Sequence, residues 1–235
     1  MTTQISPSDM LQAAEHVNAV LRDKVDDDWT RPAGSLDWDV RSTVEHMASG
    51  ISKYALYLSS RANRFVALRA AAPAEATSDD LRWALHSVSL SLAQTASGAA
   101  PGARGFHVDG MADAEGFLSM GCTEMLVHGA DVAAGLGAEL DPDEDLCRRV
   151  ANRLFPWAPQ DTDGWATLLW ATGRATLPGQ PHVGDSWMWH PAPLAEWDGS
   201  IPEDVDARAW SLDPSTGRWQ PLASPPAEAG DVRAS

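Results

Sequence analysis

The segment that most constrains the fold is residues 120–137, an apolar run that carries three ionisable side chains. With about 100° between successive residues of an α-helix, Glu124, His128 and Asp131 fall on one narrow stripe. Apolar and small residues continue that stripe, as expected of a surface that faces a core. Ionisable groups are costly to bury unless they are paired or bind a metal. The segment therefore predicts a helix that carries two metal ligands into a helical bundle, with a third ligand supplied from elsewhere.

The composition is that of a folded, acidic protein. Of 235 residues, 44% are hydrophobic and 21% are charged, which suits one large domain or a bundle with a smaller appendix. The net charge of -16 disfavours nucleic-acid and membrane partners. The N-terminal residues lack a basic flank and an apolar core, so we expect no secretory signal, and the sequence has no run of about 20 apolar residues. Cys122 and Cys147 lack the spacing of a disulfide framework or a metal site, so we expect a cytoplasmic protein with free thiols.

Apolar residues at helical spacing predict a series of helices. We expect them at about residues 8–25, 39–58, 79–98, 113–136, 145–155 and 164–173. Asp39 is expected to cap the second helix, and Asp79 or Ser78 the third. The segment 106–110, between the third and fourth helices, is expected to be a short extended piece.

The composition changes after residue 177, where Pro, Gly and Trp become frequent. The segments 186–190, 207–212 and 217–222 alternate as strands do, and a hairpin turn is expected at 213–217. We expect a metal-binding bundle over residues 1–160, a small C-terminal α+β region over 161–222, and a disordered tail over 223–235. The predicted fold is mainly α: a four-helix bundle with a small Trp-rich α+β appendix.

Two interpretations of the C-terminal tryptophans stay open. They either form the core of the appendix or wall a ligand pocket over the metal. The residues concerned are Trp187, Trp189, Trp197, Trp210 and Trp219.

The third metal ligand is expected to be a histidine of the second predicted helix. His46 lies at the border of its apolar face, where a hydrogen-bonded structural histidine is the commoner arrangement. His86 has no acidic partner one turn away and is interpreted as structural or exposed, whereas His107, His182 and His190 lie in loops with weaker claims on the pocket. A Glu-x-x-x-His pair is also common on solvent-facing helices. Two imidazoles and one carboxylate would suit zinc first, and would also accept nickel, iron or manganese.

Three segments, at residues 38–46, 124–131 and 169–178, together resemble sequences of the DinB-like superfamily, and within it those of the mycothiol-dependent maleylpyruvate isomerase family. Trp38-Asp-Val-Arg-Ser-Thr-Val-Glu-His46 is similar to the Trp-x-Val-x-x-x-(apolar)-x-His segment of that family. Glu124-Met-Leu-Val-His-Gly-Ala-Asp131 is similar to its Glu-x-x-x-His-Gly-x-Asp segment, and residues 169–178 are similar to the Gly-Arg stretch that begins its C-terminal region. The resemblance implies a DinB-like four-helix bundle with a divalent metal, usually zinc, held by His46, Glu124 and His128.

The same resemblance implies a chemistry, in which the metal stabilises the thiolate of a small thiol cosubstrate and presents it to an electrophile. In a high-GC actinobacterium, with which the preference for Arg over Lys agrees, that thiol would be mycothiol. Asp131 is expected to orient a ligand or move a proton, and Arg174 to bind an anionic group of the substrate or thiol. The predicted function is a thiol S-transferase or isomerase that acts on a small electrophilic metabolite, as a monomer or homodimer. A hydrolase that uses metal-activated water and a non-catalytic binding or stress-response module remain the alternatives.

Overall fold

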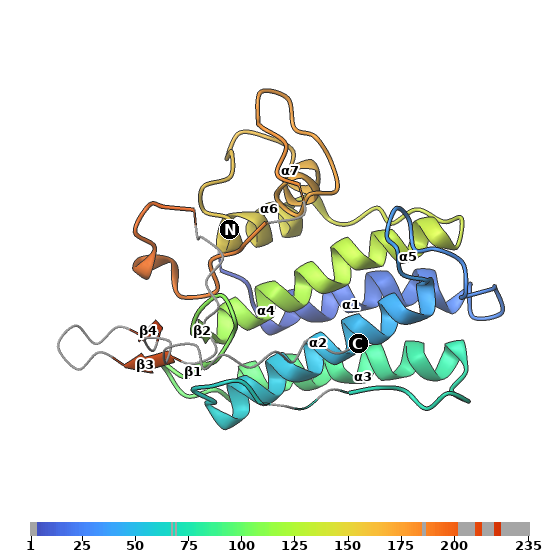
Figure 1. Cartoon of the computed structure of the whole chain (residues 1–235), viewed down its shortest axis with the longest axis horizontal. Helices are drawn as coiled ribbons and strands as arrows, with labels where there is room; N and C mark the ends of the chain where they lie inside the picture. The colour runs from blue at the N-terminus through green and yellow to red at the C-terminus, as the bar shows by residue number, and fades with distance from the viewer. Residues whose placement is uncertain are drawn as a thin grey trace, which may run out of the picture.

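The computed structural model describes residues 4–66, 68, 70–184 and 187–201, together with the backbone of two short strands near the C-terminus. The core of the fold is a bundle formed by α1 (Pro7–Arg22), α2 (Val40–Ser60), α3 (Ser78–Ser97) and a long composite fourth helix. Figure 1 shows these helices running lengthwise beside one another. The predicted mainly α, DinB-like bundle is therefore confirmed. Within the described part of the chain, no helix is both long and apolar enough to cross a membrane.

The fourth helix departs from the sequence prediction in its middle turn. It consists of α4 (Ala114–Thr123), the π-helical turn η1 (Glu124–His128) and α5 (Gly129–Gly135), whereas the spacing predicts one α-helix over 113–136. A π-turn closes i→i+5 hydrogen bonds and is wider than an α-turn, but residues four apart still lie on one face of the helix. Glu124 and His128 are the first and last residues of this turn, so their side chains still point the same way.

Side-chain caps define where the bundle helices begin. Asp39 accepts a hydrogen bond from the backbone N–H of Ser42 at 2.6 Å, which confirms it as the cap of α2. The predicted cap of α3 is wrong by one or two residues, because Thr77 forms a capping box with Asp80 and the helix already includes Ser78. In both cases a side-chain oxygen satisfies a backbone N–H that the first helical turn leaves without a partner.

The region between α3 and α4 forms a small hairpin. β1 (Arg104–Gly105) pairs with β2 (Ala112–Asp113) in antiparallel register, with Arg104 opposite Asp113. The expected extended piece at 106–110 is in fact the connection between these strands, and backbone hydrogen bonds between His107 and Gly110 close it. The hairpin places Asp113 at the N-terminus of α4, where its carboxylate accepts from the Gly116 N–H at 2.7 Å.

The C-terminal part packs against the outer side of α4. α6 (Glu144–Leu154) and α7 (Gly164–Ala171) contact each other, α6 contacts α4, and the chain then continues through loops and the short 3-10 helix η2 (Leu194–Glu196). Figure 1 shows α6 and α7 stacked along one side of the bundle. The predicted strand over 186–190 is wrong for its described part, since residues 187–190 form a loop without strand pairing.

Two of the predicted C-terminal strands are confirmed. β3 (Trp210–Leu212) and β4 (Trp219–Pro221) form an antiparallel pair with Ser211 opposite Gln220. The predicted turn at 213–217 and the predicted disordered tail lie outside the described residues, as do the side chains of the two strands. The proposed domain limits at residues 160 and 222 stay predictions.

Candidate metal centre

Three side chains from two helices converge on one point. Glu124 Oε2, on η1, lies 3.6 Å from His46 Nε2 on α2 and 3.7 Å from His128 Nε2. One ligand atom from each of the three residues lies within 4.8 Å of the others, and no other such group of His, Cys, Asp and Glu occurs in the described residues. Ligand atoms at about 2.0–2.2 Å from a zinc ion are roughly 3–4 Å apart, so this cluster is close to the size of a coordination shell.

The environment of Glu124 is consistent with a ligand carboxylate. Its Oε1 accepts a hydrogen bond from the Tyr54 hydroxyl at 2.8 Å, and both side chains are buried. Its Oε2 is buried without a hydrogen-bond partner in the described structure. Gly50 on α2 faces the carboxylate, and a Cβ there would come within 3.6 Å of Glu124 Cδ. A buried oxygen without a donor is costly, and a cation between the two imidazoles would satisfy it.

His128 is oriented by a residue on the following turn. Its Nδ1 lies 3.1 Å from Asp131 Oδ2, and with the carboxylate as acceptor Nδ1 carries the proton. The lone pair of Nε2 then faces Glu124 Oε2, the tautomer that a metal needs. Arg174 Nη2 lies 3.3 Å from the same Asp131 oxygen and 3.5 Å from Nδ1. Because Nη2 and the protonated Nδ1 are both donors, Asp131 is the acceptor for each of them.

The cluster is open on the side of His46. The His46 side chain is 43% exposed, whereas those of Glu124 and His128 are 9% and 15% exposed. Trp38 covers part of the imidazole, with its ring centroid 4.9 Å from that of His46. A bound ion would therefore keep coordination positions toward solvent, as catalytic metal sites do.

A small recess adjoins the cluster on the side of the C-terminal region. Its lining residues come from the fourth helix, from the end of α7 and from the loop after residue 186: Thr123, Glu124, Val127, His128, Thr172, Arg174, Trp187 and Trp189. Trp187 and Trp189 thus agree with the interpretation that C-terminal tryptophans wall a pocket beside the candidate metal centre. Trp197 lies farther along the loop, where its indole N–H donates to Ser200 O at 2.7 Å. The side chains of Trp210 and Trp219 lie outside the described residues.

The other sequence candidates lie outside the three-residue cluster. His107 packs behind the site, between Tyr54 at 5.9 Å and Trp189 at 5.6 Å between ring centroids. Burial lowers the pKa of His107 to about 4, which keeps it neutral. His86 packs edge-on against Trp83, and His182 is exposed.

His190 and the cysteines also have structural surroundings. The His190 imidazole lies 3.2 Å from Pro193 O, and burial lowers its pKa. Cys122 and Cys147 are buried free thiols, and burial raises the pKa of Cys147 to about 12. Both thiols are therefore protonated at neutral pH and poor nucleophiles.

Sequence reasoning missed Tyr54. It belongs to the buried face of α2, but it lies two turns from His46 on that helix, and a phenol hydroxyl needs a partner when it is buried. Its partner, Glu124, lies 70 residues away in the sequence, so no local pattern indicates the contact.

A helical bundle with two histidines and a glutamate around one point defines a class of protein with a candidate metal centre. Within that class, this chain belongs to the mycothiol maleylpyruvate isomerase family. The family model described as "Mycothiol maleylpyruvate isomerase N-terminal domain" matches residues 10–133, more than half of the chain, and confirms the resemblance in the sequence. The match includes His46, Glu124 and His128, whereas Arg174, Trp187 and Trp189 lie beyond it. No curated protein and no solved structure matches the chain.

Proposed function

We propose that this protein is a divalent-metal-dependent enzyme that uses a low-molecular-weight thiol, mycothiol. It would either transfer the thiol to a small electrophilic metabolite or isomerise such a metabolite with the help of the thiol. The observation that carries the proposal is the position of Glu124 Oε2, which is buried without a hydrogen-bond partner in the described structure and lies 3.6 and 3.7 Å from the Nε2 atoms of His46 and His128. The family match supports the link to mycothiol. Zinc is the proposed ion, with nickel, iron and manganese as alternatives that the same ligand set accepts.

His46, Glu124 and His128 would hold the ion. When bound, it would lower the pKa of a coordinated thiol and so make the sulfur a nucleophile at neutral pH. Asp131 fixes the tautomer and ring orientation of His128 by accepting from Nδ1. Tyr54 holds the other carboxylate oxygen of Glu124, so that Oε2 faces the Nε2 atoms of His46 and His128.

Arg174 would supply positive charge beside the recess. Its Nη1 donates to Thr172 O at 2.7 Å and its Nη2 faces Asp131, so the guanidinium is held in place. Its Nε is buried without a hydrogen-bond partner in the described structure, which leaves a donor for an anionic group of the thiol or substrate. Arg174 therefore has two proposed roles, cofactor binding and catalysis by charge stabilisation, and Asp131 would link it to the metal ligands. The site would act in the cytoplasm, where small thiols are kept reduced.

Elemental analysis of untagged protein purified without chelators tests the metal. We expect one divalent ion per chain in the wild type, and loss of that ion in Glu124→Ala with the helical circular dichroism retained. Glu139→Ala, at an exposed carboxylate outside the cluster, is the matched control and should keep the ion. A wild type without stoichiometric metal, or a Glu124→Ala variant with full metal, would contradict the assignment.

Turnover of an electrophile such as maleylpyruvate, with and without mycothiol, tests the chemistry. We expect turnover only when the thiol is present. Equal turnover without thiol would favour a hydrolase that uses activated water, and no turnover despite bound metal would favour a non-catalytic binding or stress-response role.

A further inference from the structure

The loop over residues 187–197, here called the strap, forms one wall of the recess beside the candidate metal centre. Trp187 and Trp189 line the recess, and their ring centroids lie 5.3 Å apart at an angle of 70°, so the two indoles form a corner. Trp189 is 6% exposed, and its indole N–H is buried without a hydrogen-bond partner in the described structure. Such an N–H usually finds an acceptor, and a polar ligand atom in the recess would provide one.

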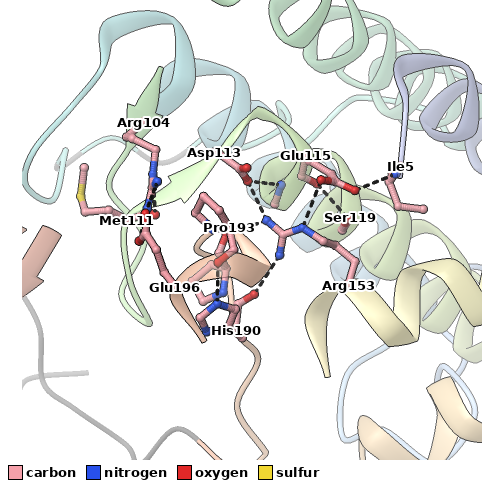
Figure 2. A network of polar contacts seen from close by, with 12 residues as sticks. Ile5, Arg104, Met111, Asp113, Glu115, Ser119, Arg153, His190, Pro193 and Glu196 are labelled. Carbon is pink, nitrogen blue, oxygen red and sulfur yellow. Dashed lines mark hydrogen bonds and ion pairs between the residues drawn. The ribbon is translucent and has the colours of Figure 1, made fainter. Parts of the chain in front are cut away.

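The strap is held from its other side by Arg153 of α6. This arginine is 2% exposed, and its Nη2 lies 2.7 Å from Asp113 Oδ1 and 3.3 Å from Pro191 O, while its Nη1 donates to His190 O at 3.2 Å. Figure 2 shows the guanidinium with Asp113 at the end of β2 and Glu115 in the first turn of α4 on one side, and the strap at His190 on the other. One buried side chain thus joins α6, α4 and the strap directly after the two tryptophans.

Two further contacts hold the strap along its length. The His190 backbone N–H donates to Leu154 O at 2.7 Å, and Arg104 of β1 forms a two-bond pair with Glu196 at 2.8 and 3.0 Å (Figure 2). A paired carboxylate and guanidinium with both bonds formed fixes orientation as well as distance. The strap therefore has one attachment close to the tryptophans and another at its far end.

Gly116 in the first turn of α4 makes this close attachment possible. A Cβ at this position would lie 2.1 Å from Pro191 O, 3.0 Å from Asp113 Oδ1 and 3.1 Å from Arg153 Nη2. The first distance is to a backbone atom of the strap, so any larger residue would move the strap away from α4. The strap can therefore lie this close to α4 only because residue 116 is a glycine.

We propose that the strap is a positioned wall of the active site, whose attachment by Gly116, Arg153 and the Arg104–Glu196 pair places Trp187 and Trp189 so that they restrict and bind what reaches the metal. This inference rests on the proposed metal- and thiol-dependent function. The tryptophans would be specificity-determining residues that contact the body of the thiol, while Gly116, Arg153, Arg104 and Glu196 would be positioning residues that act through them.

The test uses zinc-loaded full-length protein and three variants. Trp187→Leu removes part of the wall, Gly116→Ala displaces the strap, and Glu196→Gln weakens its far attachment without a steric change. Gly98→Ala is the matched control, because a Cβ there would meet only helix carbonyl oxygens of α3, the nearest at 3.6 Å. Two quantities are measured: the rate at which a chromophoric chelator removes zinc, and the dissociation constant of mycothiol by titration calorimetry.

We expect every variant to keep one zinc per chain with equilibrium affinity within about two-fold of the wild type, since the metal ligands are untouched. Trp187→Leu and Gly116→Ala should accelerate zinc removal and weaken mycothiol binding about ten-fold, the size of one lost aromatic contact. Glu196→Gln should change both in the same direction by a smaller factor, and Gly98→Ala should change neither.

The outcomes separate the two proposals. Unchanged zinc removal and mycothiol binding in both Trp187→Leu and Gly116→Ala would overturn the role of the strap while leaving the proposed function intact. Faster zinc removal in the variants, combined with no mycothiol binding by any of the proteins, would support the strap as a wall of the site and overturn mycothiol as the cosubstrate. A wild type that binds no zinc would overturn both.

Discussion

Replacing Tyr54 by Phe is expected to weaken zinc binding while leaving the bundle folded. The Tyr54 hydroxyl donates to Glu124 Oε1 at 2.8 Å in a buried environment, and it is the hydrogen bond that holds this carboxylate. Burial, and then the charge of Glu124, raise the pKa of Tyr54 well above its ordinary value, so the hydroxyl keeps its proton at neutral and alkaline pH. The phenol is therefore a permanent donor.

The expected loss of zinc affinity follows from the Glu124 Oε1 atom that Tyr54→Phe leaves without a hydrogen-bond donor. In the metal-free Tyr54→Phe variant, we expect the Glu124 side chain to turn and so relieve its unpartnered Oε1, a group whose burial costs about 1–3 kcal/mol. In zinc-loaded protein the carboxylate is fixed by the ion, so the cost falls mainly on the bound state. Partners of metal ligands are typically worth 10–100-fold in affinity, or about 1.4–2.7 kcal/mol. We expect the zinc dissociation constant of Tyr54→Phe to rise by about that factor.

Competition against a chromophoric zinc chelator measures this change. Tyr57→Phe is the control, because Tyr57 lies on the same helix, is also buried, and does not bond to Glu124. It should bind zinc as the wild type does, although it loses a hydroxyl too. Zinc affinity of Tyr54→Phe within two-fold of the wild type, with native circular dichroism, would refute the reasoning that Tyr54 positions the ligand carboxylate.

Three further predictions concern titration, thiol reactivity and the tautomer of a ligand. Burial lowers the pKa of His107 from 6.5 to about 4, so between these pH values the unfolded chain binds a proton that the folded chain does not. The free energy of unfolding is therefore greatest above pH 6.5 and falls as the pH drops toward 4. The loss is up to about 3 kcal/mol, and urea unfolding of His107→Asn should show a correspondingly flatter pH dependence. Cys122 and Cys147 should not react with a disulfide reagent at pH 8 in native protein, because burial raises the pKa of both thiols, that of Cys147 to about 12; both should react in guanidinium. Asp131→Ala should lower zinc affinity about ten-fold, because His128 Nδ1 loses the acceptor that fixes its tautomer.

Each of these has a distinct contrary result. An identical pH dependence in wild type and His107→Asn would show that His107 is not the group that titrates on unfolding. Rapid modification of either cysteine in native protein would mean that the packing around it opens readily. Zinc affinity of Asp131→Ala equal to that of the wild type would assign the orientation of His128 to other contacts.

The features that the sequence indicated are those that depend on nearby residues. Asp39 caps α2 because its side chain reaches the backbone of Ser42, and the stripe of Glu124, His128 and Asp131 follows from their spacing on one helix. Such contacts need only local backbone geometry, which helical periodicity already specifies. The turn type itself was not predictable in this way, since the π-turn at Glu124–His128 interrupts a segment whose spacing fits an α-helix throughout.

Tertiary structure decided what surrounds those residues. Tyr54 contacts Glu124, which lies 70 residues away in the sequence. Arg153 contacts strap residues that lie 37 and 38 residues away. Gly116 matters only because Pro191 O packs against it. These contacts arise from how whole helices and loops pack, and no periodicity within one segment encodes the partner. The sequence by itself thus determined the bundle and the stripe of candidate ligands, whereas packing decided which oxygen of Glu124 is left without a donor and which tryptophans line the recess beside it.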